Sequence, residues 1–293
     1  MQVAYNLGAF STDADRLIGI LRQNGALLAR RGVCLPEPAV FRQPMRDTLS
    51  ALQGRAASAA TATALCDAVA GEAADGLQRL IFSHAHFLAQ PERILTPRGP
   101  YPFAGDRLGP LVNLFPQAQT EFYFALINPA LLIGTLAAQL RGRSYAEVMA
   151  GLRPEAIRWA PVVEAMVRGA RGRPLTVWCN EDLPLVLPEV LRAIAGLSEE
   201  DPLAGEDGLL AALLTDDGLA RLQDYIASRP PHSVAQRRKV VSAFLEQHAR
   251  ADALEQELPL PGWTEELVGR IAESYAADTT RVAALPGVRF IAP

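Results

Sequence analysis

The sequence is poor in the residues that mark disulfide-bonded, zinc-binding and membrane-spanning proteins. It has three cysteines, Cys34, Cys66 and Cys179, and no two of them form a Cys-x-x-Cys motif. This odd, widely spaced set predicts neither a disulfide framework nor a zinc knuckle, and it fits a reducing compartment. No apolar run approaches the length of about 18 residues that a membrane helix needs. The first residues also lack a basic segment followed by a long apolar stretch, so we expect no signal peptide, no membrane span and a cytoplasmic location.

Lysine is almost absent as well. Lys239 is the only lysine, so 27 of the 28 basic residues are arginine. The 32 acidic residues outnumber them and give a formal net charge of −4. Such a chain has no overall attraction for nucleic acid or for an anionic membrane. We therefore expect no nucleic-acid partner, and any site for an anion must be local.

Apolar residues are abundant, and their spacing predicts an α/β protein. The chain has 293 residues, of which 49% are hydrophobic, enough for one large core. Short apolar runs alternate with helical patterns, and residues 122–127 are apolar throughout, as in a central parallel strand. The predicted strands contain residues 3–5, 33–35, 80–82, 122–127, 175–179 and 288–291. This alternation predicts an open, mostly parallel sheet with helices on both sides.

Helical spacing dominates the second half of the sequence. The predicted helices cover residues 17–28, 56–74, 103–115, 130–140, 144–170, 187–197, 209–226, 234–254 and 265–284. We expect a single α/β domain over residues 1–293, in which residues 204–261 form a helical annex to the core.

The first strand leads into a short polar loop and then a helix. In an open α/β sheet this arrangement usually builds an anion site, because backbone N–H groups at the helix start point beyond the strand. Here the loop carries Asp13 and Asp15 and no lysine. Ser11, Thr12 and Asp13 are also the residue types preferred as helix caps, so capping is an alternative reading of the loop.

Several segments resemble motifs of the sulfotransferase family, in particular its bacterial carbohydrate-type branch. Residues 6–14, Asn-Leu-Gly-Ala-Phe-Ser-Thr-Asp-Ala, resemble the donor loop, usually His-hydrophobic-Gly-Ala-His-Lys-Thr-Gly-Thr. Residues 125–129 with Thr135 resemble the second donor motif, Arg-Asn-Pro followed by a serine. Trp159, residues 177–181 and the closing segment 275–290 are also similar to the family.

The resemblance implies a three-layer, P-loop-like fold and the sulfuryl donor 3′-phosphoadenosine-5′-phosphosulfate (PAPS). It also implies a carbohydrate or other small-molecule ligand. The positions that would hold the donor are Gly8, Ala9, Ser11, Thr12, Asn128 and Thr135.

The chain departs from both donor motifs at their charged positions. Ser11 replaces the lysine, Asp13 replaces the flexible glycine, and Ile127 replaces the arginine that grips the 3′-phosphate. A carboxylate about 5 Å from the phosphosulfate costs about 0.8 kcal/mol at the dielectric of water and about 3 kcal/mol at an effective dielectric of 20. Loss of the arginine removes about 1.5–3 kcal/mol more. We therefore expect PAPS to bind weakly or not at all, and no other cofactor is predicted.

His84 and His86 are the other candidate site residues. They follow the third predicted strand at i and i+2, a spacing that places both side chains on one face at the ligand-binding edge of an α/β sheet. In relatives an acidic residue near Ala85 acts as the base, and either histidine could replace it. The pair could instead bind a metal ion, although no third ligand is identifiable, or one histidine could be buried and the other solvated.

Three further groups of charged residues have weaker claims to a role. Glu181 and Asp182 follow the fifth predicted strand, where they could cap the next helix or face the ligand. The basic run 237–239 is predicted to be a solvated helix face, but in relatives such a run can contact the 3′-phosphate. Arg141 and Arg143 are comparable.

Three functions are compatible with these patterns. The first is a sulfotransferase-like protein that has lost PAPS binding and acts as a non-catalytic or divergent binding or accessory protein, a pseudoenzyme. The second is an active sulfotransferase that transfers a sulfuryl group to a hydroxyl of a carbohydrate or lipid-like acceptor, with His84 or His86 as base. The third is a metal-binding protein that uses the same two histidines.

Overall fold

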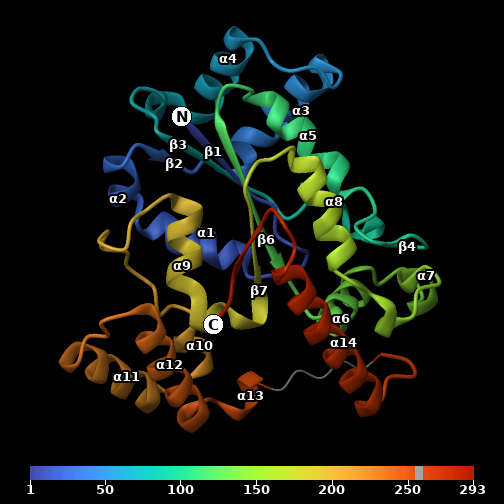
Figure 1. Cartoon of the computed structure of the whole chain (residues 1–293), viewed down its shortest axis with the longest axis vertical. Coiled ribbons are helices and arrows are strands. Elements are labelled where there is room, and N and C mark those ends of the chain that lie inside the picture. The colour runs from blue at the N-terminus through green and yellow to red at the C-terminus, as the bar shows by residue number, and fades with distance from the viewer. Residues whose placement is uncertain (255–259) are drawn as a thin grey trace.

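A parallel six-stranded sheet forms the centre of the molecule (Figure 1). The computed structural model describes residues 1–254 and 260–293. The strands are β1 (Gln2–Asn6), β2 (Val33–Cys34), β3 (Arg79–Ser83), β6 (Gln119–Leu126), β7 (Leu175–Cys179) and β8 (Val288–Ile291). They lie in the order β2-β3-β1-β6-β7-β8, and all five pairings between them are parallel. The predicted strands and their parallel arrangement are confirmed.

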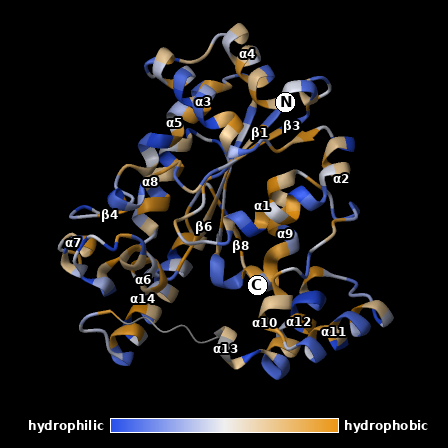
Figure 2. Ribbon diagram, turned by 180° about the vertical axis from the view of Figure 1, so that it is seen from behind, coloured by the Kyte–Doolittle hydropathy of each residue, from blue (hydrophilic) through white to orange (hydrophobic). Residues whose placement is uncertain are grey.

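Helices cover both faces of this sheet, so the predicted three-layer α/β fold is confirmed (Figure 1). One face is covered by α1 (Ala14–Gln23), α2 (Gly25–Arg30) and α9 (Leu183–Ala195). The other is covered by α3 (Pro38–Leu52), α4 (Ala59–Ala70), α5 (Ala104–Leu114), α6 (Pro129–Gln139), α7 (Tyr145–Met149), α8 (Ala160–Ala170) and α14 (Glu265–Ala283). Figure 2 shows hydrophobic residues gathered along the strands, whereas the surrounding helices carry both hydrophobic and hydrophilic residues. The buried strands thus separate two apolar layers.

Two glycines allow α5 and α8 to pack with their backbones in contact. A Cβ atom built on Gly105 would lie 2.4 Å from the carbonyl oxygen of Ala165, and one built on Gly169 would lie 2.0 Å from the carbonyl oxygen of Gly105. Real Cβ atoms do not approach other atoms this closely. The crossing of the two helices therefore requires glycine at both positions.

The predicted helix over residues 144–170 is wrong as a continuous element. The structure has α7 and α8 there, with a short 3₁₀ helix η3 (Pro154–Ala156) between them. Ala150 and Gly151 adopt positive φ angles of 50° and 80° directly after α7. This left-handed turn and the following Pro154 end the first helix, because neither conformation continues an α-helix.

A layer of short helices extends the molecule beyond α9, where the helical annex was predicted. It contains α10 (Leu210–Leu213), α11 (Asp216–Ser228), α12 (Val234–His248) and α13 (Ala251–Leu254). Residues 255–259 of the predicted annex lie outside the described residues. Leu210, Leu214, Leu222 and Val241 form a small buried cluster within this layer. The predicted helices 209–226 and 234–254 are each interrupted, and an isolated bridge between Leu214 and Ala249 joins the two interruptions.

Some elements had no counterpart among the predictions. They are α3, the 3₁₀ helices η2 (Pro91–Arg93) and η4 (Asn180–Asp182), and the antiparallel pair β4 (Leu95–Thr96) and β5 (Gly99–Pro100), whereas the 3₁₀ helix η1 (Gly71–Ala74) forms the end of the predicted helix 56–74. Helix α3 contains Pro44, which disguises its helical pattern. Within the described residues, none of the helices has the length and apolar character needed to cross a membrane.

Candidate functional site

The candidate residues lie where β1, β3, β6 and β7 end. Residues 7–13, called here the first loop, connect β1 to α1, and His84 follows β3 directly. The backbone N–H of His84 donates to the carbonyl oxygen of Asn6 at 3.3 Å, which joins the two segments. The parallel sheet therefore brings both candidate groups to its carboxyl edge, as predicted.

Several polar groups of the first loop donate hydrogen bonds to other atoms of the protein. The Phe10 N–H donates to the Tyr101 hydroxyl at 2.8 Å, and the Thr12 N–H and hydroxyl both donate to the Ala9 carbonyl oxygen, at 3.4 and 2.9 Å. Gly8 begins the turn with a φ of 52°. Ala9 and Phe10 are buried, so their side chains anchor the loop in the core.

Ser11 and Thr135, which come from the two predicted donor motifs, are in contact. The Ser11 hydroxyl donates to the Thr135 Oγ1 at 3.0 Å, and Thr135 Oγ1 in turn donates to the Leu131 carbonyl oxygen at 2.9 Å. Ser11 has a φ of 66°, in the left-handed region that non-glycine residues rarely adopt. The serine thus closes the loop against α6 in a strained conformation.

The capping role considered for Ser11, Thr12 and Asp13 is wrong. Asp13 precedes α1, but no side chain caps this helix. Instead, the Asp13 N–H donates to Asn180 Oδ1 at 2.9 Å, and Asn180 Nδ2 donates back to the Asp13 carboxylate at 3.0 Å. Asn180, which follows β7 and lies 167 residues further along the chain, holds the Asp13 carboxylate. The carboxylate therefore does not accept hydrogen bonds from the N–H groups at the start of α1.

Asn128 caps α6, as its Asn-Pro sequence predicts, but its own backbone N–H is occupied. The Asn128 side chain accepts from the Ala130 N–H at 2.9 Å, and its N–H donates to Glu181 Oε1 at 2.6 Å. Glu181 Oε2 accepts from the Tyr275 hydroxyl at 3.1 Å. Burial raises the pKa of Glu181, while these hydrogen bonds oppose the shift. Neither Glu181 nor Asp182 caps α9 through its side chain, so that alternative is also wrong.

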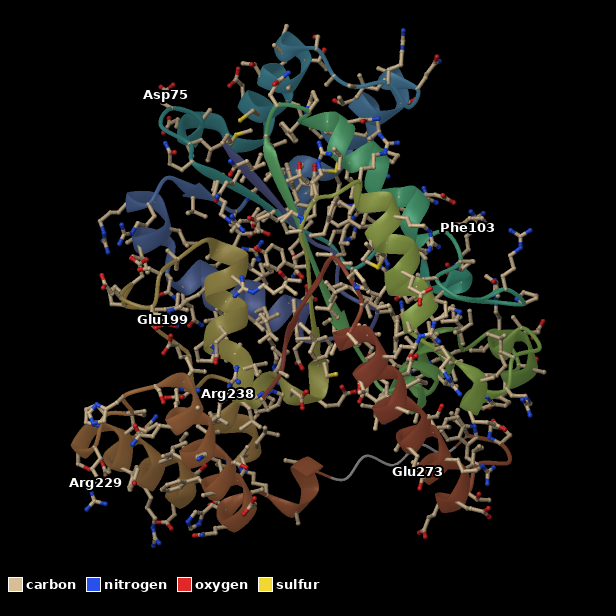
Figure 3. All side chains as sticks on the ribbon, viewed as in Figure 1. Asp75, Phe103, Glu199, Arg229, Arg238 and Glu273 are labelled. Atoms are coloured by element: carbon tan, nitrogen blue, oxygen red, sulfur yellow. The ribbon has the colours of Figure 1, made fainter. Side chains whose placement is uncertain are left out.

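Within the described residues, neither Ile127 nor Arg237 and Arg238 of the late basic run supplies an unpaired cation. Ile127 is buried, and its carbonyl oxygen accepts from Trp159 Nε1 at 2.8 Å. Arg237 pairs with Asp207, which precedes α10, and Arg238, labelled in Figure 3, pairs with Glu189 of α9 at 2.8 Å. The prediction of a solvated face is therefore wrong for these two arginines, because acidic partners hold them half-buried. The Arg141 Nε donates to the Ala138 carbonyl oxygen at 3.1 Å.

His84 and His86 lie together beside a cavity of about 440 Å³. Their ring centroids are 5.2 Å apart in an edge-to-face arrangement, and the two residues lie in the turn after β3 and not in the strand itself. Burial, together with the charges of Arg42, His86 and Arg46, lowers the pKa of His84 to about 4, and the charge of Asp15 opposes this shift. His86 Nδ1 is buried and has no hydrogen-bond partner among the described residues. Both imidazoles line the cavity, so both are placed to meet a ligand.

The cavity and the first loop are distinct parts of this edge. The cavity is lined by Phe41, Arg42, Met45, Arg46, Leu49, His84, His86, Phe87, Gln90, Phe103, Asp106, Arg107, Pro110 and Leu111. The predicted donor-site residues Gly8, Ala9, Ser11, Thr12, Asn128 and Thr135 do not line it. The structure therefore joins Ser11 to Thr135 and His84 to His86, but it does not join the two pairs in one cavity.

Sequence reasoning missed the arginines of this cavity. Arg42 and Arg46 lie on α3, which was not predicted, and Arg107 lies on α5. The i, i+4 spacing of Arg42 and Arg46 was a signal available in the sequence, since it places both on one face of a helix.

The described residues supply no third metal ligand near the histidines. Over residues 1–254 and 260–293, no three His, Cys, Asp or Glu side chains are grouped to hold a metal ion.

Comparisons with models of protein families, with curated proteins and with solved structures found no match to this chain.

Proposed function

We propose that this chain is a sulfotransferase-like protein that has lost PAPS binding and acts as a non-catalytic binding or accessory protein. The observation that carries the proposal is that backbone N–H groups of the first loop already donate hydrogen bonds to other protein atoms. The N–H groups of Phe10, Thr12 and Asp13 donate to protein atoms instead of facing an open anion site. A loop of this kind binds phosphate through its N–H groups, so a ligand would have to displace these contacts.

Electrostatics at the loop support the same conclusion. Asp13 directly precedes α1, and Asp15 occupies its first turn. Their negative charges oppose the positive end of the helix dipole, although the Asp13 carboxylate does not cap the helix. Ser11 supplies no cation, and Ile127 is part of the apolar core. Binding a nucleotide with several negative charges would add repulsion without a compensating ion pair.

The test is thermal denaturation with millimolar 3′-phosphoadenosine 5′-phosphate, the product of the donor. A ligand that binds the native state raises its melting temperature, so we expect no rise for the wild-type protein. The double variant Ser11→Lys/Asp13→Gly restores two positions of the donor motif and is expected to gain a rise. The control variant Ser228→Lys/Asp224→Asn changes the charge equally on α11 and should gain none.

Two outcomes would count against the proposal in different ways. A rise of several degrees with the wild-type protein would overturn the loss of donor binding. A restored variant that folds but gains no rise would overturn the relation of this loop to a donor loop.

The second candidate is an active sulfotransferase, and it is favoured by the histidine pair. With a pKa of about 4, His84 is neutral at neutral pH and could accept a proton. It would take the proton of an acceptor hydroxyl while that oxygen bonds to sulfur and the bond from sulfur to the donor's bridging oxygen breaks. This candidate requires transfer from PAPS that His84→Ala/His86→Ala abolishes. A base with so low a pKa is weak, which favours the first proposal.

A further inference from the structure

The cavity beside the histidines combines an apolar interior with a cationic border. Helix α3 contributes Phe41, Met45 and Leu49, and α5 contributes Pro110 and Leu111. Phe103, which precedes α5, is 50% exposed and lies on the outside of the molecule (Figure 3). At about 440 Å³, the cavity has the size of a site for a small organic molecule.

In the part of the chain that the structure describes, three arginines at this cavity have no acidic partner. Among the described residues Arg42, Arg46 and Arg107 make no ion pair, although arginines elsewhere in the chain commonly do. Arg46 donates instead to Gln43 Oε1. Among the described residues, Asp106 is the only acidic one in the lining, so three positive charges face one negative charge there.

The histidines add hydrogen-bonding capacity at the same place. His86 Nδ1 is a buried polar atom without a partner in the described structure. A buried polar atom of this kind costs free energy unless a ligand or water satisfies it. Burial is the main cause of the lowered pKa of His84, and the positive charges of Arg42 and Arg46 add to it.

We infer that this cavity binds an amphipathic organic anion, a molecule with an apolar aromatic or aliphatic body and one carboxylate or sulfonate group. The body would lie against the apolar side chains, and the anionic group would meet Arg42, Arg46 and Arg107. A purely polar anion would leave the apolar interior unused, and a neutral molecule would leave the arginines unpaired. This inference does not rest on the proposed function, because the first loop contributes no residue to the cavity.

Isothermal titration calorimetry with ligands that share one body and differ in their polar group tests this inference. The probes are 2-naphthoate, 2-naphthalenemethanol and 2-naphthylmethylamine, with decanoate as an anion of different shape. We expect 2-naphthoate or decanoate to bind at least tenfold more tightly than the alcohol, and the amine to bind least. Inorganic sulfate is expected to compete weakly or not at all.

Variants of the exposed arginines then connect binding to the cavity. Arg42→Gln/Arg46→Gln should weaken binding of the anion about tenfold or more, because a charge-assisted hydrogen bond is lost at each site. Arg30→Gln, on the opposite face of the sheet, should leave it unchanged. Melting temperatures check that the variants remain folded.

Any of three results would overturn the inference. The first is that neither 2-naphthoate nor decanoate binds at millimolar concentration. The second is that the alcohol or inorganic sulfate binds as tightly as the organic anion. The third is that the folded arginine variants retain full affinity.

Discussion

At the scale of single residues, His84 links the candidate site to the stability of the protein. Its pKa lies near 4 in the folded chain, whereas an unperturbed histidine titrates near 6.5. Between these values the unfolded chain binds a proton that the folded protein does not. Stability contributed by the neutral side chain is therefore present above pH 6.5 and is lost as the pH falls toward 4.

We predict that His84→Asn reduces this pH dependence. Wild-type protein should lose about 1 kcal/mol of unfolding free energy from this residue between pH 7 and pH 5, after allowance for solvent screening of a half-buried group. Urea denaturation at both pH values measures the loss. His232→Asn, which alters an exposed histidine, is the control. The same pH dependence in wild type and His84→Asn would contradict the assignment.

At the scale of elements, the crossing of α5 and α8 depends on two missing side chains. Gly169 and Gly105 let one helix backbone rest against the other. Even a methyl group at either position must separate the helices or distort them, and both consequences lower stability.

Gly169→Ala is accordingly expected to destabilise the protein by about 2–3 kcal/mol, measured as a lower midpoint of urea denaturation. Gly269→Ala is the matched control, because a Cβ atom there has nothing within 4 Å in the structure. That substitution, in the second turn of α14, should be neutral or stabilise by about 0.5–1 kcal/mol. Equal effects of the two substitutions would show that the close backbone contact is not required.

At the scale of the whole molecule, Arg79 joins the sheet to one of its helical layers. It is 3% exposed and donates to Glu121 Oε2 at 2.6 Å, to the Tyr123 hydroxyl at 2.9 Å and to the Ile194 carbonyl oxygen at 2.9 Å. The guanidinium also meets the carbonyl end of α9, where the helix dipole favours a cation.

Loss of Arg79 would leave a carboxylate and several carbonyl oxygens without their partner. We predict that Arg79→Met costs about 3–5 kcal/mol of unfolding free energy. The double variant Arg79→Met/Glu121→Gln should recover part of that cost, since it removes the stranded charge. Chemical denaturation of the two variants compares them, and no recovery in the double variant would argue against the pairing as the cause.

The sequence predicted those features of the molecule that are determined by residues close together in the chain. It did not predict features that depend on contacts between distant residues. The strand at residues 122–127 was found because burial on both faces leaves an unbroken apolar run. His84 and His86 were expected on one face of an extended segment, whereas the structure brings them together in the turn that follows β3. The capping expectation for Asp13 failed because Asn180 binds its carboxylate, and no local pattern records a partner so far along the chain. Arg42 and Arg46 were missed with the helix that carries them.

The glycine contact between α5 and α8 also determines how the cavity can respond to an occupant. Helix α5 forms one wall, and its backbone is wedged against α8, so this wall has little freedom to shift. The facing wall, on α3, presents Arg42, Met45 and Arg46, whose long side chains can change rotamer. Side chains on α3 would thus rearrange to accommodate ligands of different width. The position of α5 would stay the same for each of these ligands.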